Sequence, residues 1–273
     1  MVQDNDKTTF WEHLDVLRLS IIRSIIVTSV LSVIIFCFKD FLFEGIVFAP
    51  TKEEFCTFRF LNYFSEKFSI EDTSLLEIQP VKIINTKLSA QLFIHLSISF
   101  YFALIISIPY ILGEIWFFLK PALYEHEKKL TIKALCFMTL LFYLGVLTSY
   151  FLIFPLSVNF LAAYQVSPEI ENLVDLDSYI DTLTSLTLSL GLVFELPVLA
   201  HFLSKIGILS YNFMKNHRKH AFIAVLFLAA IITPSTDIFT MLLTALPLQL
   251  IYELSVSMVK RNEKLSLKKN ITN

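Results

Sequence analysis

Apolar residues gather in six segments of the chain, and most polar residues lie between them. The segments cover about 19–38, 88–111, 134–154, 183–203, 221–233 and 238–258. Each of the first four has roughly the 20 residues that a helix needs to cross a bilayer core about 30 Å thick. The pattern predicts an all-α integral membrane protein, with six transmembrane helices in a single membrane domain over residues 1–273.

The fifth and sixth segments are separated by only the five residues from Thr233 to Asp237. The fifth segment is too short to cross a bilayer of ordinary thickness. Two arrangements are open: a re-entrant hairpin, or a pair of short spans across a thinned bilayer. Because Lys and Arg residues flank both outer ends of the pair, we predict that the last two spans are short transmembrane helices.

Composition agrees with a membrane protein, because 55% of the residues are hydrophobic and the mean hydropathy is +0.67. Glycine is scarce, with 5 residues, so close helix packing of the GxxxG type is not expected to be a theme. The 3 cysteines have no metal-ligand spacing. The first apolar segment ends at Lys39-Asp40 without a small-residue cleavage site and is interpreted as a retained anchor.

The distribution of charge predicts the orientation. Most of the 22 Lys and Arg residues lie before the first span, between spans two and three, between spans four and five, and after the last span. The segment between spans three and four carries acids and no basic residue. The positive-inside rule therefore places both termini in the cytoplasm, with 259–273 as a basic cytoplasmic tail.

Some acids lie on this basic side, against the local positive charge: Glu12, Asp15, Glu114, Glu125 and Glu127. Carboxylates pair with guanidinium groups in bidentate geometry, so such a cluster would bind a peptide that bears arginines. Two simpler interpretations stay open. The first acids could belong to an amphipathic interfacial helix that leads into the first span, and the last two could favour a helix N-terminus through its dipole.

Glu195 lies deeper in an apolar segment than any other acid of the chain. A carboxylate at mid-bilayer depth costs roughly 2–3 kcal/mol. Pro197 follows closely and is expected to kink the helix about one turn earlier. Three roles are open for Glu195: a hydrogen bond between helices of this chain, proton transfer, or a polar contact for another helix. We prefer the contact, with a partner's transmembrane helix or a translocating signal peptide.

Six short motifs, in order along roughly residues 10–258, resemble those of the TatC family, the receptor subunit of the twin-arginine protein translocase. They are His13–Arg18, Trp116–Glu127, Tyr150-Phe151 with Phe154-Pro155, Phe194–Pro197, Thr233-Pro234 with Asp237, and Leu246-Pro247 to Tyr252-Glu253.

This resemblance implies a glove-like fold of six spans and no enzymatic activity. It implies recognition of twin-arginine signal peptides at the cytoplasmic face, and export of folded proteins driven by the proton-motive force. The implied partners are TatA- and TatB-type single-span proteins and further copies of the chain in the lipid bilayer. No cofactor, metal or nucleic acid is expected. The expected location is a bacterial inner membrane.

Carried over by position, Glu127 matches the acid of the first cytoplasmic loop that is thought to meet the arginine pair. Arg18 matches the arginine of the N-terminal motif, and Phe118 matches the aromatic residue just before the proline of that loop. The predicted signal-peptide site comprises Glu127, Arg18, Asp15, Glu12, Glu125 and Phe118. The predicted intramembrane partner contacts are Glu195 and Thr240, and the predicted structural residues of the outer face are Pro50 and Asp237.

The chain departs from the family pattern at two positions. Val16 replaces the glutamate that usually stands in the N-terminal motif, so Asp15, Glu12 or the later acids must substitute for it. Met241 replaces a glutamine that often follows the position of Thr240.

Two other function classes are weighed against this interpretation. A proton-coupled small-molecule transporter would use Glu195 as its carrier site, but the sequence shows no internal repeat. An intramembrane enzyme would need a catalytic motif, and the sequence has no HExxH, no GxSxG and no paired aspartates within its spans.

Overall fold

Helices dominate the computed structural model, which describes residues 10–68, 81–119, 125–165, 167, 172–234 and 237–271. Within these described ranges, five helical runs are long and apolar enough to cross a membrane. They cover Leu14–Cys37, Ala90–Phe118, Ala134–Ala163, Leu176–Lys205 and Ile238–Lys264. The prediction of an all-α membrane protein with several spans is confirmed.

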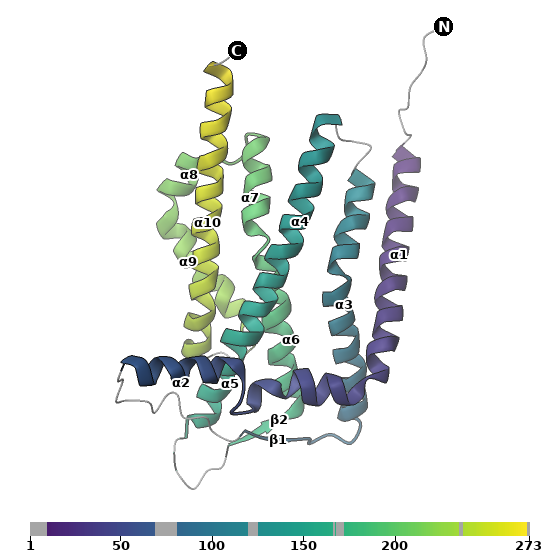
Figure 1. The fold of residues 1–273 in the computed structure, drawn as a ribbon, viewed down its shortest axis with the longest axis vertical. Helices are drawn as coiled ribbons and strands as arrows, with labels where there is room; N and C mark the ends of the chain where they lie inside the picture. The colour runs from purple at the N-terminus through teal and green to yellow at the C-terminus, as the bar shows by residue number, and fades with distance from the viewer. Residues whose placement is uncertain are drawn as a thin grey trace. The chain divides into compact units, whose positions relative to one another are not determined.

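Figure 1 shows the helices. They extend beyond the apolar segments that predicted them, and two of them, α6 and α7, share the segment 183–203. Their bounds are α1 Phe10–Cys37, α2 Cys56–Phe68, α3 Ala90–Leu119, α4 Glu125–Thr148, α5 Phe154–Ala163, α6 Leu176–Val193, α7 Leu196–Lys205, α8 Tyr211–Asn216, α9 Arg218–Ile232 and α10 Ile238–Ile271. Single turns of wider or tighter helix form η1 (Phe41–Val47), η2 (Ala49–Thr51) and η4 (Ser149–Ile153).

The last two predicted spans differ from each other. Helix α9 has 15 residues, which give a length of about 22 Å, so it is short as predicted. Helix α10 has 34 residues and continues to Ile271. The predicted sixth span, 238–258, and the predicted basic tail from residue 259 thus belong to one continuous helix in the described residues. Lys, Glu, Arg and Leu in that tail favour helix, which allows α10 to continue past its apolar part.

The chain divides into two compact units. Unit 1 comprises Met1–Lys39 and His95–Thr139, and unit 2 comprises Asp40–Ile94 and Leu140–Asn273. Within unit 1, α1 and α3 lie side by side and run antiparallel (Figure 1). The hydroxyls of Thr28 and Ser107 hydrogen-bond at 3.0 Å, and the rings of Phe36 and His95 stack with centroids 4.0 Å apart. These contacts fix the register of the two helices. Helix α1 is continuous from Phe10 to Cys37, so the described residues that precede the first span belong to the same helix as the span.

Within unit 2, α4 and α6 approach closely at two glycines, Gly145 and Gly191. A Cβ on Gly145 would lie 2.6 Å from the carbonyl oxygen of Leu190, and a Cβ on Gly191 would lie 2.8 Å from the ring of Phe142. Each of the two helices contributes a single glycine, so this contact is not of the GxxxG type. Scarcity of glycine says nothing about where the few glycines lie.

The segment between the first two spans is held by tyrosines of unit 2. Tyr150 donates a hydrogen bond to the carbonyl of Ile46, and Tyr179 donates one to the carbonyl of Val47, both at 2.7 Å. Tyr179 and Val47 are almost fully buried. Pro50 is buried in the adjacent turn η2. These bonds satisfy carbonyl groups that the local helical turns leave without a partner.

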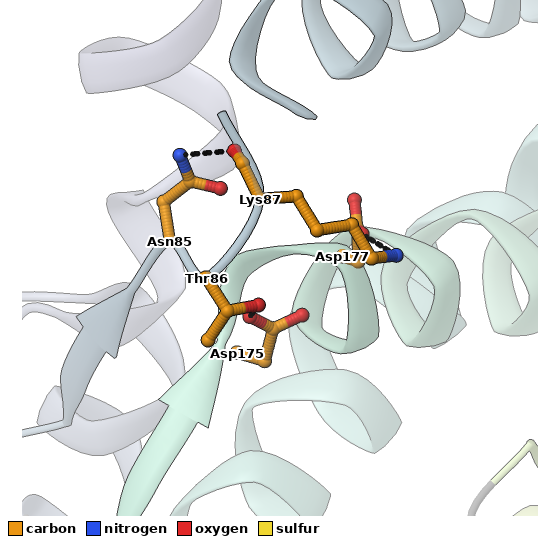
Figure 2. Close-up of polar contacts among 5 residues, drawn as sticks. All are labelled: Asn85, Thr86, Lys87, Asp175 and Asp177. Atoms are coloured by element: carbon orange, nitrogen blue, oxygen red, sulfur yellow. Dashed lines mark hydrogen bonds and ion pairs between the residues drawn. The ribbon is translucent and has the colours of Figure 1, made fainter. Parts of the chain in front are cut away.

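A two-stranded parallel sheet, which the sequence did not predict, joins β1 (Lys82–Ile84) to β2 (Leu173–Asp175) in unit 2. Polar side-chain contacts next to the sheet stabilise one end of it (Figure 2). Thr86 donates a hydrogen bond to Asp175 at 2.8 Å, and Lys87 Nζ lies 2.5 Å from Asp177 Oδ2. The hydrogen bond and the charge of Asp177 raise the pKa of Lys87 above its ordinary value of 10.5.

We expect Asp177→Asn to loosen this sheet in a way that depends on pH. A lysine whose pKa is raised by folding contributes stability below its unfolded pKa and loses that contribution as the pH rises through the folded pKa. Amide exchange in β1 should therefore be about twofold faster in the variant than in the wild type between pH 6 and 9. The two proteins should converge only above about pH 10.5.

The control for this experiment is Lys52→Met, because the Lys52 ammonium group donates a solvent-exposed hydrogen bond to the carbonyl of Glu44 and not to the sheet. It should leave exchange in β1 unchanged. A difference between Asp177→Asn and wild type that vanishes near pH 7 would contradict the assignment.

Candidate functional site

The register of α1 against α3 brings part of the predicted signal-peptide site together at one end of unit 1. Thr28 lies opposite Ser107, and five residues earlier Arg23 lies opposite Glu114. A further five residues along α1, ~7.5 Å at the rise of an α-helix, reach Arg18. Arg18 is thus level with the C-terminal end of α3, where Phe118 lies.

Side chains at this end of unit 1 are accessible. Asp15 and Arg18 are exposed on α1, and Phe118 is half-buried on α3. Helix α4 begins at Glu125, which places Glu125 and Glu127 in its first turn. The side chains of these two acids and of Glu12 lie outside the described residues, as do residues 120–124. Six peptide steps from Leu119 reach at most about 20 Å, so α4 begins within that distance of α3.

Glu114 belongs to a cluster that sequence reasoning did not resolve. Tyr110, one helical turn earlier on α3, donates a hydrogen bond to Glu114 Oε1 at 2.8 Å. Arg23 Nη1 of α1 lies 3.9 Å from Glu114 Oε2. The side chain of Glu114 is 12% exposed and that of Arg23 is 55% exposed. The spacing of Tyr110 and Glu114, four residues apart on a helix, was an available signal, but the partner on α1 depends on the helix register.

The second candidate site, in unit 2, is the break between α6 and α7. Helix α6 ends at Val193 and α7 begins at Leu196, with Glu195 between them and Pro197 in the first turn of α7. The predicted kink is confirmed. Proline lacks the N–H that would continue the backbone ladder, and the amide of Glu195 instead donates to the carbonyl of Leu192, three residues earlier.

The carboxyl group of Glu195 is half-buried, and its Oε2 has no hydrogen-bond partner among the described residues. Gln249 on α10 also has a buried side-chain oxygen without a partner in the described chain. Sequence reasoning missed this glutamine, although a lone amide in the apolar segment 238–258 was a visible signal. Buried polar groups are normally satisfied, so both oxygens suit a polar partner that is not part of the described chain.

Thr240 and Asp237 lie at the start of α10. Asp237 Oδ1 accepts a hydrogen bond from the backbone N–H of Thr240 at 2.6 Å, which is the geometry of a helix cap. Thr240 is fully buried. Its Oγ1, like Oε2 of Glu195, is buried without a hydrogen-bond partner among the described residues, so Thr240 stays a predicted partner contact together with Glu195.

The opposite end of α10 is joined to α7 and α8, against which it packs. The side chains of Asn262 and His201 lie 2.7 Å apart, and Glu263 accepts a bond from the backbone N–H of Tyr211 at 2.6 Å. Arg218 of α9 forms an ion pair with Glu253 of α10 at 2.7 Å. Residues 259–263 of α10 are thus packed against the rest of unit 2, which stabilises helix past residue 258.

Comparisons with known proteins show the family of this chain. The sequence model of the family described as Sec-independent protein translocase protein (TatC) matches residues 12–247. The chain belongs to the TatC family. It is 35% identical to the TatC protein of Blattabacterium sp. subsp. Periplaneta americana over 262 residues, which cover 94% of this chain and 96% of the relative. It is 31% identical to the TatC protein of Desulforapulum autotrophicum, over 94% of this chain and 86% of the relative.

A solved structure, titled Crystal Structure of Twin Arginine Translocase Receptor- TatC, has the same fold. Its TM-score is 0.68 at 32% identity, over 91% of this chain and 98% of that chain. As a member of the TatC family with several apolar spans, this chain is a multi-pass membrane protein and a component of a Sec-independent protein translocase.

Proposed function

We propose that this TatC family member is the receptor for twin-arginine signal peptides and the core subunit of its translocase. It binds the arginine pair at the end of unit 1 where α1 begins and α3 ends. It takes part in the export of folded proteins, which is driven by the proton-motive force. Its membrane is a bacterial inner membrane, with both termini in the cytoplasm.

The helix register of unit 1 carries this proposal. Asp15, Arg18 and Phe118 come from segments about 100 residues apart in the sequence, and the contacts between α1 and α3 bring them to one level. Glu125 and Glu127 begin the next helix within about 20 Å. Carboxylates beside an aromatic side chain suit a guanidinium group, which pairs with the acids and stacks on the ring.

The partners that we propose are TatA- and TatB-type single-span proteins, which would contact unit 2 at Glu195, and further copies of this chain. A carboxyl oxygen without a partner in an apolar helix is satisfied when another helix brings a donor to it. Pro50 and Asp237 are proposed as structural residues, a buried turn and a helix cap. No observation favours the alternative of a proton-coupled transporter.

Glu127→Gln is expected to weaken binding of a fluorescent twin-arginine signal peptide by tenfold or more. The substitution keeps the size of the side chain and removes the charge, and a charge-assisted pair with arginine contributes roughly 1.5–3 kcal/mol. Affinity should be measured by fluorescence anisotropy on the purified full-length protein. Wild-type affinity should also fall as salt is added, because salt screens interactions between exposed charges.

Glu54→Gln is the control, since Glu54 is an acid of unit 2 with 88% of its side chain exposed. It should bind the peptide like wild type, and a peptide with both arginines replaced by lysine should bind the wild type more weakly. Equal binding of both peptides, together with unchanged binding in Glu127→Gln, would refute the receptor assignment.

A further inference from the structure

The cluster of Tyr110, Glu114 and Arg23 in unit 1 has the features of a binding site for a guanidinium group. The hydrogen bond from Tyr110 at 2.8 Å engages one oxygen of Glu114 and orients the carboxylate. The other oxygen, Oε2, is buried and has no hydrogen bond among the described residues. Arg23 Nη1 lies 3.9 Å from this oxygen.

Arg23 holds Glu114 only loosely. Charge-assisted hydrogen bonds between arginine and carboxylate have N···O distances of about 2.7–2.9 Å, and they are frequently bidentate. Arg23 and Glu114 are farther apart than that, and more than half of the Arg23 side chain is exposed. The pair neutralises the charge of Glu114 without satisfying its hydrogen-bonding capacity, so a better-placed guanidinium could displace Arg23.

Glu114 faces the same side of α3 as the proposed signal-peptide contact Phe118. Residues four apart on a helix lie on one face, one turn or ~6 Å apart, and Tyr110, Glu114 and Phe118 follow that spacing. Arg23 and Asp15 are eight residues apart, so they likewise share a face of α1. Glu114 thus lies one turn deeper along the face of α3 that ends at Phe118.

Resting on the proposed receptor function, we propose that Glu114 is a second binding site for a signal-peptide arginine, which Arg23 occupies until the peptide arrives. The peptide's guanidinium replaces that of Arg23 on Glu114. The carboxylate therefore remains paired with one positive charge throughout the exchange. The released Arg23 is already half-exposed, and its long side chain can keep the guanidinium group hydrated. One peptide arginine then binds Glu114, and the other binds the acids at the start of α4.

The test measures binding of a fluorescent twin-arginine signal peptide to the full-length protein in nanodiscs. If Arg23 competes, Arg23→Gln should bind the peptide about fivefold more tightly than wild type, which corresponds to the pair being closed in about four-fifths of the molecules. Glu114→Gln should bind about fivefold more weakly. The double variant should bind like Glu114→Gln, because without the acid there is nothing to compete for.

Arg59→Gln is the matched control. Arg59 forms an ion pair with Glu54 at the same distance of 3.9 Å, but both side chains are well exposed and belong to unit 2. This variant should bind like wild type. Thermal unfolding of each variant separates a change in affinity from a loss of folded protein.

A purely structural role for the Arg23–Glu114 pair makes the opposite prediction, because loss of Arg23 would then lower or preserve affinity. Unchanged or weaker binding by folded Arg23→Gln overturns the inference. Should that variant not fold, Arg23→Lys replaces it. About twofold tighter binding is then expected, because the more strongly hydrated ammonium competes less well for the buried carboxylate, and unchanged binding overturns the inference. Failure of the receptor function itself shows separately, as equal binding of the twin-arginine and twin-lysine peptides to wild type.

Discussion

Gly145→Ala is expected to lower the free energy of unfolding by about 2–3 kcal/mol, the range for overpacking a tight contact. The added Cβ would lie 2.6 Å from the carbonyl oxygen of Leu190 and 2.9 Å from Gly191 Cα. Both of these atoms belong to the backbone of α6, so a side-chain rotation cannot relieve the clash. Helices α4 and α6 would have to separate, with loss of packing around Phe142 and Leu190, which are almost fully buried.

Thermal unfolding in detergent micelles measures this effect, and two other glycines provide graded controls. At Gly113 on α3, a Cβ meets nothing within 4 Å, so Gly113→Ala should stabilise the protein by up to about 0.8 kcal/mol through helix propensity. At Gly191 the clash is with the Phe142 ring rather than with backbone, so Gly191→Ala should cost less than Gly145→Ala. Equal unfolding temperatures for Gly145→Ala and Gly113→Ala would contradict the close approach of α4 and α6.

Glu195→Leu is expected to act in opposite directions on stability and on assembly. Removing a buried carboxyl oxygen that lacks a partner should stabilise the isolated protein by about 1 kcal/mol. Association with a TatA- or TatB-type partner should weaken about tenfold, because the partner helix loses its polar contact in the membrane. Such a trade between stability and function is typical of a functional site. A structural role within the chain would instead make the variant less stable.

Photo-crosslinking measures the assembly effect directly. A crosslinker at position 195 should capture a co-expressed TatA- or TatB-type protein, and co-purification of that protein should fall in Glu195→Leu. Leu199 is the positional control, since it lies one turn later on α7 and is half exposed. Crosslinks from position 195 only to other parts of this chain, combined with a destabilised Glu195→Leu, would favour the structural interpretation.

Much of the fold was predictable because membrane insertion depends on a local property, the length of an apolar segment. The all-α class, the long spans and the break before Pro197 follow from short windows of sequence, and the structure confirms them. The length of α10 did not follow, since hydropathy identifies the part of a helix that crosses the membrane and not where the helix ends. Tertiary contacts with His201 and Tyr211, residues of α7 and α8, stabilise α10 beyond its apolar part, at Asn262 and Glu263.

The candidate sites also have features that follow from the sequence and features that depend on the tertiary structure. The sequence by itself determined which residue types are unusual for their surroundings: an acid deep in an apolar helix at Glu195, and acids on a basic face at Asp15 and Glu114. These follow from the chain alone because the cost of a charge in lipid depends mainly on its depth.

Only the tertiary structure decided which of these residues meet. The pairing of Arg23 with Glu114, the close approach of Gly145 to α6 and the burial of Thr240 each depend on the register between helices far apart in the chain. That register results from side-chain packing along whole helices. No local window of sequence contains that information.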